Sequence, residues 1–66
     1  MLFRNIRAEM ARRNLSSADM ARELKISETT WRAKMRGAYP FDTVELREIK
    51  RVLGGTYEYL LDESTT

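Results

Sequence analysis

Thr29, Arg32 and Arg36 recur every three or four positions, so on a helix they share one face with Glu28 and Ala33. These residue types are suited to contacts with the edges of DNA bases. The guanidinium of Arg32 can form a bidentate pair with guanine O6 and N7, Thr29 can contact a thymine methyl, and the short Ala33 allows close approach. The stripe therefore predicts a helix that binds in the major groove.

Glu28 has two interpretations that the sequence does not separate. Its carboxylate can accept a hydrogen bond from cytosine N4. It also falls in the first turn of the expected helix, where a negative charge interacts favourably with the helix dipole whatever the function.

A second set of residues is suited to DNA phosphates. Ser17 lies at the start of an expected helix, where free N–H groups and the serine hydroxyl can hold a phosphate. Lys34 and Arg36 are candidate cationic partners, whereas Lys25 is better explained as an ordinary surface charge. Tyr39 follows the stripe, where either its hydroxyl reaches a phosphate or its ring covers the edge of the core.

The stripe is expected on a helix over about residues 28–36, which Ser27 caps and Gly37 ends. A preceding helix over about 17–24 begins after Ser16, which forms a capping-box pattern with the residue three positions later. Lys25 and Ile26 form the turn between them, and the inward-facing residues are expected to be Met20, Ala21, Leu24, Trp31 and Met35.

The small side chain of Ala21 lets these two helices cross closely and steeply. Trp31 can in principle stack on a base, but its position opposite the stripe favours packing in the core. Two short helices with a tight turn and a polar outer face on the second are typical of a helix-turn-helix.

Three further helices are expected over about 2–13, 43–53 and 57–61. Their inward-facing residues include Phe3, Ile6, Met10, Leu46, Ile49, Val52 and Leu53. No segment alternates with a period of two. The sequence therefore predicts an all-α bundle of five helices, with one domain over 1–61 and a disordered tail over 62–66.

Composition limits the possible functions. The 66 residues include neither cysteine nor histidine, so disulfides and His/Cys metal sites are excluded and no cofactor is expected. The chain has no phosphate-binding glycine loop and no carboxylate pair expected to be buried together, so we expect neither an enzyme nor a small-molecule substrate. No apolar run is long enough for a membrane span or a signal peptide, which predicts a soluble, cytoplasmic protein.

Charge is unevenly distributed along the chain. Residues 1–41 contain nine Lys or Arg against four Asp or Glu, whereas 42–66 contain three against six. A basic part beside an acidic part is consistent with one face turned toward a polyanion. It is equally consistent with a small, well-solvated helical protein, so charge alone does not decide.

The stretch from Leu15 to Gly37 resembles the lambda-repressor-like (Cro/C1, or XRE) helix-turn-helix family. The matching residues are Leu15, Ser16, Met20, Ala21, Leu24, Ile26, Ser27, Thr30, Trp31, Arg36 and Gly37, followed by Val52, Leu53, Gly54, Thr56, Glu58, Tyr59, Leu60 and Leu61. The resemblance covers about residues 3–61. It implies five helices, binding to double-stranded DNA and, usually, repression from a symmetric operator; short members are often phage or prophage regulators.

The resemblance also implies roles for particular positions. It places base contacts at Ser27, Glu28, Thr29, Arg32 and Ala33, and phosphate contacts at Ser17, Lys34, Arg36 and the loop through Tyr39. Three positions depart from the family pattern. Lys25 replaces the turn glycine, at a cost of about 1 kcal/mol for a positive φ. Met10 and Met35 replace a frequent ion pair, and Gly55 replaces an apolar residue.

The leading hypothesis is a transcriptional repressor that binds its operator as a homodimer, because one such domain offers few base contacts. Tyr57, Tyr59 and Leu61 are the candidate dimer residues, since they cannot all turn inward on so short a helix. The alternative for this helix is that Tyr59 and Leu60 are core and only Tyr57 is exposed. The alternative function is an antitoxin-like or adaptor module that uses the same fold to bind a protein.

Overall fold

The computed structural model describes residues 3–62, which form five helices and no strand. The helices are α1 (Arg4–Arg12), α2 (Ser17–Leu24), α3 (Glu28–Met35), α4 (Thr43–Leu53) and α5 (Tyr57–Leu60). The predicted all-α fold with five helices is confirmed. Of the expected tail, 62–66, only Asp62 lies within the described residues.

The helix boundaries agree closely with the predictions. Those of α2 and α4 are as predicted, and α3 and α5 each end one residue earlier. α1 begins later than the expected 2–13, because Phe3 adopts a left-handed conformation (φ 54°) directly before it, and it ends one residue earlier, at Arg12. Leu2 lies outside the described residues.

Side-chain caps explain where the helices begin. The Ser16 hydroxyl accepts from the Asp19 amide at 3.1 Å, and the Ser16 amide donates to the Asp19 carboxylate at 2.9 Å. Asp42 and Glu45 form the same reciprocal pair at α4, at 2.7 and 2.9 Å. The predicted cap at Ser27 is also present, and Thr56 caps α5 in the same way.

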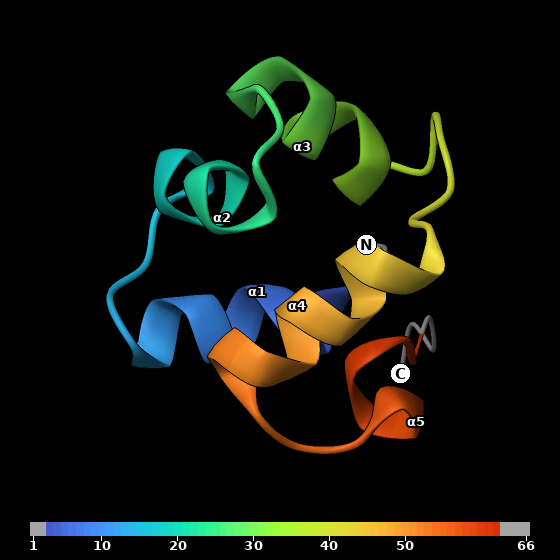
Figure 1. Ribbon diagram of the computed structural model, residues 1–66. Helices are drawn as coiled ribbons and strands as arrows, with labels where there is room; N and C mark the ends of the chain where they lie inside the picture. The colour runs from blue at the N-terminus through green and yellow to red at the C-terminus, as the bar shows by residue number, and fades with distance from the viewer. Residues whose placement is uncertain (1–2, 63–66) are drawn as a thin grey trace.

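The five helices form two groups (Figure 1). α1, α4 and α5 pack against one another, while α2 packs against both α3 and α4 and so joins α3 to the rest. α3 lies at the periphery of the molecule, beyond α2 (Figure 1). This arrangement leaves one side of α3 without a neighbouring helix. None of the helices within residues 3–62 has the length and apolar character needed to cross a membrane.

Trp31 anchors α3 to the core. Only 1% of the residue is exposed, and its ring lies 5.6 Å from that of Phe41, which in turn contacts Phe3 at 5.4 Å. Core packing of Trp31 is therefore confirmed over base stacking. Met10 and Met35 are both buried in the same core, in agreement with the expected apolar replacement of an ion pair.

The turn between α2 and α3 places Lys25 at a positive φ, as expected for a residue that stands where the family pattern has glycine. Lys25 has φ 60° and ψ 40°, the left-handed region that costs about 1 kcal/mol for a residue with a Cβ. Its amide and that of Ile26 donate to the Arg22 and Ala21 carbonyls, at 3.2 and 3.0 Å. These bonds complete the end of α2 and direct the chain into α3.

Candidate nucleic-acid interface

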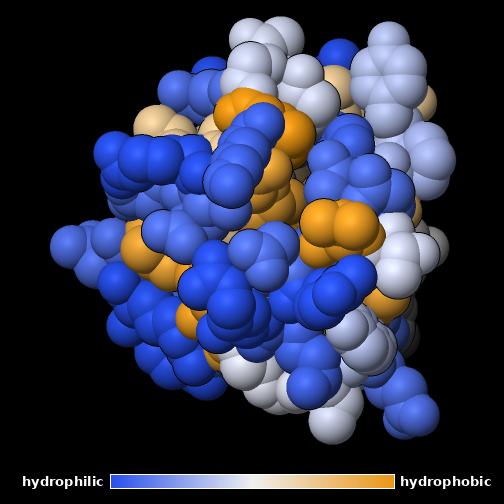
Figure 2. Space-filling view, in the orientation of Figure 1, coloured by the Kyte–Doolittle hydropathy of each residue, from blue (hydrophilic) through white to orange (hydrophobic). Residues whose placement is uncertain are grey.

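The outer face of α3 is open to solvent where the stripe of polar residues was expected. Thr29, Arg32 and Arg36 are exposed, and 64% of the Arg32 side chain is accessible. On the space-filling view, hydrophilic residues dominate the visible face, with apolar side chains showing between them (Figure 2). Three of the predicted contact residues are therefore exposed, two on α3 and the third, Arg36, at its C-cap.

Glu28 and Arg32 form an ion pair across one turn of α3. A glutamate four positions before a basic residue is the favourable orientation on a helix. The Glu28 side chain is 40% exposed, so water screens the pair and its contribution to stability is small. Its main consequence is geometric, because the carboxylate restrains the guanidinium that was expected to contact a guanine.

Ala33 is not part of the exposed stripe, contrary to the prediction. Only 5% of the residue is accessible. A methyl group reaches less far than the side chains around it, and the chain turns back at Gly37 (φ 88°), where the Ala38 amide donates to the Ala33 carbonyl at 2.9 Å. This Schellman-type ending brings residues 37–38 over the last turn of α3. Ala33 is therefore largely withdrawn from the surface on which the stripe was expected.

Lys34 is likewise unavailable for the predicted phosphate contact. Its ammonium lies 2.5 Å from both carboxylate oxygens of Glu45, and the two side chains are only 15% and 8% exposed. Glu45 also accepts the Asp42 amide within the α4 capping box. Lys34 thus holds the end of α3 against the start of α4. Helical spacing could not reveal this pair, because the two residues lie eleven positions apart on different helices.

Of the remaining candidates, Ser17 is half-buried and lines a surface hollow of about 270 Å³ between α1 and α3. Ser27 caps α3 and is exposed, and Lys25 is exposed on the turn. Tyr39 is 62% exposed, so its ring lies mostly in solvent and does not cover the edge of the core. Tyr39 borders a second hollow, of about 400 Å³.

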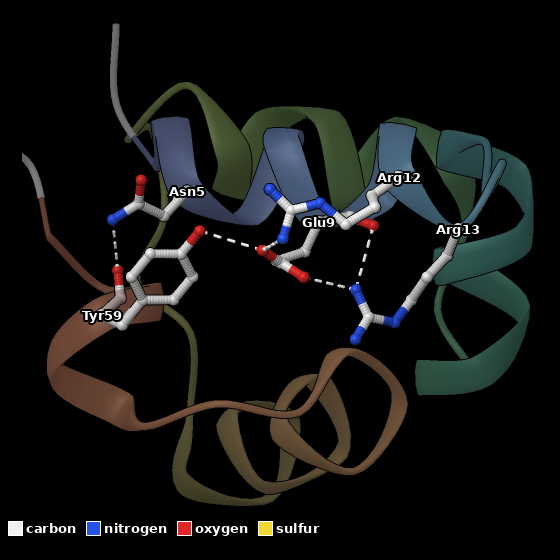
Figure 3. A network of polar contacts seen from close by, with 5 residues as sticks. All are labelled: Asn5, Glu9, Arg12, Arg13 and Tyr59. Carbon is white, nitrogen blue, oxygen red and sulfur yellow. Dashed lines mark hydrogen bonds and ion pairs between the residues drawn. The ribbon is translucent and has the colours of Figure 1, made fainter.

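A buried carboxylate, Glu9, organises a polar network that the sequence analysis missed (Figure 3). The residue is 6% exposed, and its carboxylate pairs with Arg13 and, at 2.6 Å, with Arg12. The Tyr59 hydroxyl donates to it at 2.9 Å, while Asn5 donates to the Tyr59 carbonyl at 2.8 Å. The i+3 and i+4 spacing of the arginines was visible in the sequence, but the approach of Tyr59 from fifty residues away was not.

The network changes the pKa of both acidic groups. The hydrogen bond from Arg13, followed by that from Tyr59, lowers the pKa of Glu9 below its ordinary 4.5, because both stabilise the carboxylate. The bond to Glu9 raises the pKa of Tyr59 above 10.0, because the phenol donates to a negative charge. Glu9 is therefore ionised and Tyr59 protonated at neutral pH, which fastens α5 to α1.

The contacts of Tyr59 and Leu61 within the chain leave fewer of the candidate dimer residues available to a partner. Tyr59 remains partly exposed but its hydroxyl is bound within the chain, and Leu61 packs against the core. Leu60 is fully buried, as the alternative interpretation held. Tyr57 is exposed and lies beneath the Lys50 ammonium, 5.6 Å from it. Of the three residues, Tyr57 is the one whose side chain is neither bonded to α1 nor packed on the core.

Comparison with known proteins adds no relative. Searches of protein-family models, curated proteins and solved structures found no significant match to this chain.

Exposed hydrogen-bond donors follow one another along α3 and its C-cap. Within residues 3–62, no three carboxylates gather closely enough to hold a metal ion. Arg32 and Arg36 instead place donors on an exposed helix, with Thr29 on the same face. Donors spread along one helix can bind a polymer that passes over the surface.

Proposed function

We propose that this chain is a sequence-specific DNA-binding regulator of the lambda-repressor-like type, with α2 and α3 as its helix-turn-helix. The observation that carries the proposal is the division of α3 into two faces. Trp31 fixes one face in the core, while Thr29, Arg32 and Arg36 stand in solvent on the other. With its side chains an α-helix is about 10–12 Å across, which fits a major groove about 12 Å wide.

In this proposal Arg32 contacts a guanine and Thr29 a thymine methyl, with Ser27 and Glu28 at the leading end of the helix. Glu28 restrains Arg32, so the guanidinium has less conformational freedom to lose when it binds. Arg36, Ser17 and Tyr39 are left to bind phosphates, since Lys34 is paired with Glu45. Phosphate contacts fix the position and orientation of the protein along the duplex, and so determine which bases the helix contacts.

We further propose that the protein acts in the cytoplasm as a homodimer on a palindromic operator, as a repressor of the phage or prophage kind. The small number of base contacts from α3 supports this, because two half-sites about one helical turn apart are needed for useful discrimination. Tyr57 is the residue of α5 best placed for a partner subunit, since it is exposed.

The direct test is selection of bound sites from a pool of random duplexes. We expect a palindromic consensus with half-sites about 10 base pairs apart. Arg32→Ala should weaken binding to the selected site by about 1–3 kcal/mol and relax the preference at one position of each half-site. A pool that shows no enrichment, or a variant with unchanged preference, would contradict the proposal.

One observation favours a second function, that of a protein-interaction module. The hollow of about 400 Å³ is lined largely by apolar side chains, including Phe3, Phe41, Leu46 and Leu61. Salt dependence separates the two functions. A DNA-binding protein loses affinity for a duplex steeply as salt rises, with a log–log slope near −0.9 for each phosphate neutralised. Absent or salt-independent duplex binding would favour the protein partner.

A further inference from the structure

The hollow between α1 and α3 has polar groups from three helices around it. Its volume is about 270 Å³. Arg7 comes from α1, Ser17 from α2 and Arg32 from α3. The apolar residues that line it are Met10, Trp31 and Met35.

Arg7 differs from the other arginines near the end of α1. Arg12 and Arg13 are both paired with Glu9. The Arg7 side chain is exposed and has no hydrogen bond or ion pair within residues 3–62, whereas the backbone amide of Arg7 donates to the Phe3 carbonyl. Its charge is therefore not neutralised inside the molecule, and its five N–H donors are free for a ligand.

The chemistry of the hollow matches a nucleic-acid backbone. A free guanidinium binds phosphate oxygens through paired, charge-assisted hydrogen bonds, and the Ser17 hydroxyl supplies a further donor on the same rim. The apolar lining is suited to a deoxyribose ring, which carries few polar groups. Arg32 borders the same hollow while its side chain stays 64% exposed and tied to Glu28.

We propose that α1 belongs to the DNA interface, with Arg7 and Ser17 binding a backbone phosphate next to the base contacted by Arg32. This inference rests on the proposed function. The shared hollow sets the distance between the phosphate contact and the base contact. Arg7 thereby helps to fix the register of α3 along the duplex, and it increases affinity without adding sequence preference.

The test compares three proteins by fluorescence anisotropy on the selected duplex and on a random duplex over a range of salt concentrations. Arg7→Gln should reduce the slope of log affinity against log salt concentration by about 0.9 in magnitude. It should also weaken binding to both duplexes by the same factor. Arg47→Gln is the matched control, because it removes the same charge from the exposed side of α4. It should leave the slope close to that of the wild type. Arg7→Lys should keep the slope, since it keeps the charge.

The outcomes separate this inference from the function on which it rests. If the wild type binds the duplex with a steep salt slope but Arg7→Gln has the same slope, the phosphate contact is wrong and DNA binding stands. An equal loss of slope in Arg47→Gln, or a changed base preference in Arg7→Gln, would also overturn the contact. If the wild type itself shows no salt-dependent binding, the proposed function fails and the phosphate contact with it.

Discussion

Replacing Lys34 by methionine should strongly destabilise the fold. The substitution keeps an apolar stem of similar length but removes the ammonium that lies 2.5 Å from both Glu45 oxygens. Glu45 then keeps only the Asp42 amide, at 2.9 Å, as a partner in surroundings where its side chain is 8% exposed. The cost arises because a carboxylate withdrawn from water is left without its counter-ion.

The size of the effect follows from this burial. Removing one partner of a buried ion pair costs about 3–5 kcal/mol. Since 15% of the Lys34 side chain reaches water, we expect a loss near the lower value, about 3 kcal/mol. A domain of this length has a total stability of about 3–10 kcal/mol. The variant is therefore expected to lose a large fraction of its free energy of unfolding.

Urea denaturation followed through the fluorescence of Trp31, the single tryptophan, measures this loss. With a slope of about 1 kcal/mol per molar urea, the midpoint should fall by about 3 M. Arg47→Met, at an exposed position, is the control and should change stability by at most about 0.5 kcal/mol. Lys34→Met/Glu45→Gln should be more stable than Lys34→Met alone, because the unpaired charge is gone. An unchanged midpoint for Lys34→Met would refute the reasoning.

Three further predictions concern stability. Ala21→Leu should cost about 1–3 kcal/mol by overpacking the contact between α2 and α3, where Ala21 is 3% exposed; an unaltered melting temperature would argue against a close crossing. Lys25→Gly should raise the free energy of unfolding by about 0.5–1 kcal/mol by relieving the left-handed conformation, and a loss in urea denaturation would contradict this. Glu9→Gln should destabilise the protein at neutral pH. Because the folded pKa of Glu9 is lowered, its contribution is present above the unfolded pKa and is lost as the pH falls below 4.5 through the folded pKa. Denaturation curves of both proteins from neutral to acid pH should therefore converge, and a constant difference would refute the role of the Glu9 charge.

Much of the fold was predictable because the signals are local. Capping residues such as Ser16 and Asp42 act on amides three positions away, so they mark helix starts in the sequence itself. The spacing of Trp31 and Met35 likewise defined the buried face of α3 before any contact was known. Lys25 was recognisable as a left-handed residue only through its position at a turn where the family resemblance places glycine.

The site was predictable only in part, because side-chain availability depends on partners distant in the sequence. Lys34 was expected to bind a phosphate, but its ammonium is paired with Glu45. Ala33 lies on the outer face by helical spacing, but only 5% of the residue is accessible in the fold. Tyr59 is held by Glu9, fifty residues earlier. Spacing along one helix cannot reveal such contacts.

Entry of α3 into the major groove can be tested by methylation interference on the selected site. Dimethyl sulfate modifies guanine N7 in the major groove and adenine N3 in the minor groove, so the two grooves are distinguished in one experiment. We expect methylation of one guanine in each half-site to abolish binding of the wild type but to matter much less for Arg32→Ala. Interference at adenine N3 alone, or at neither atom, would contradict a base-contacting role for α3.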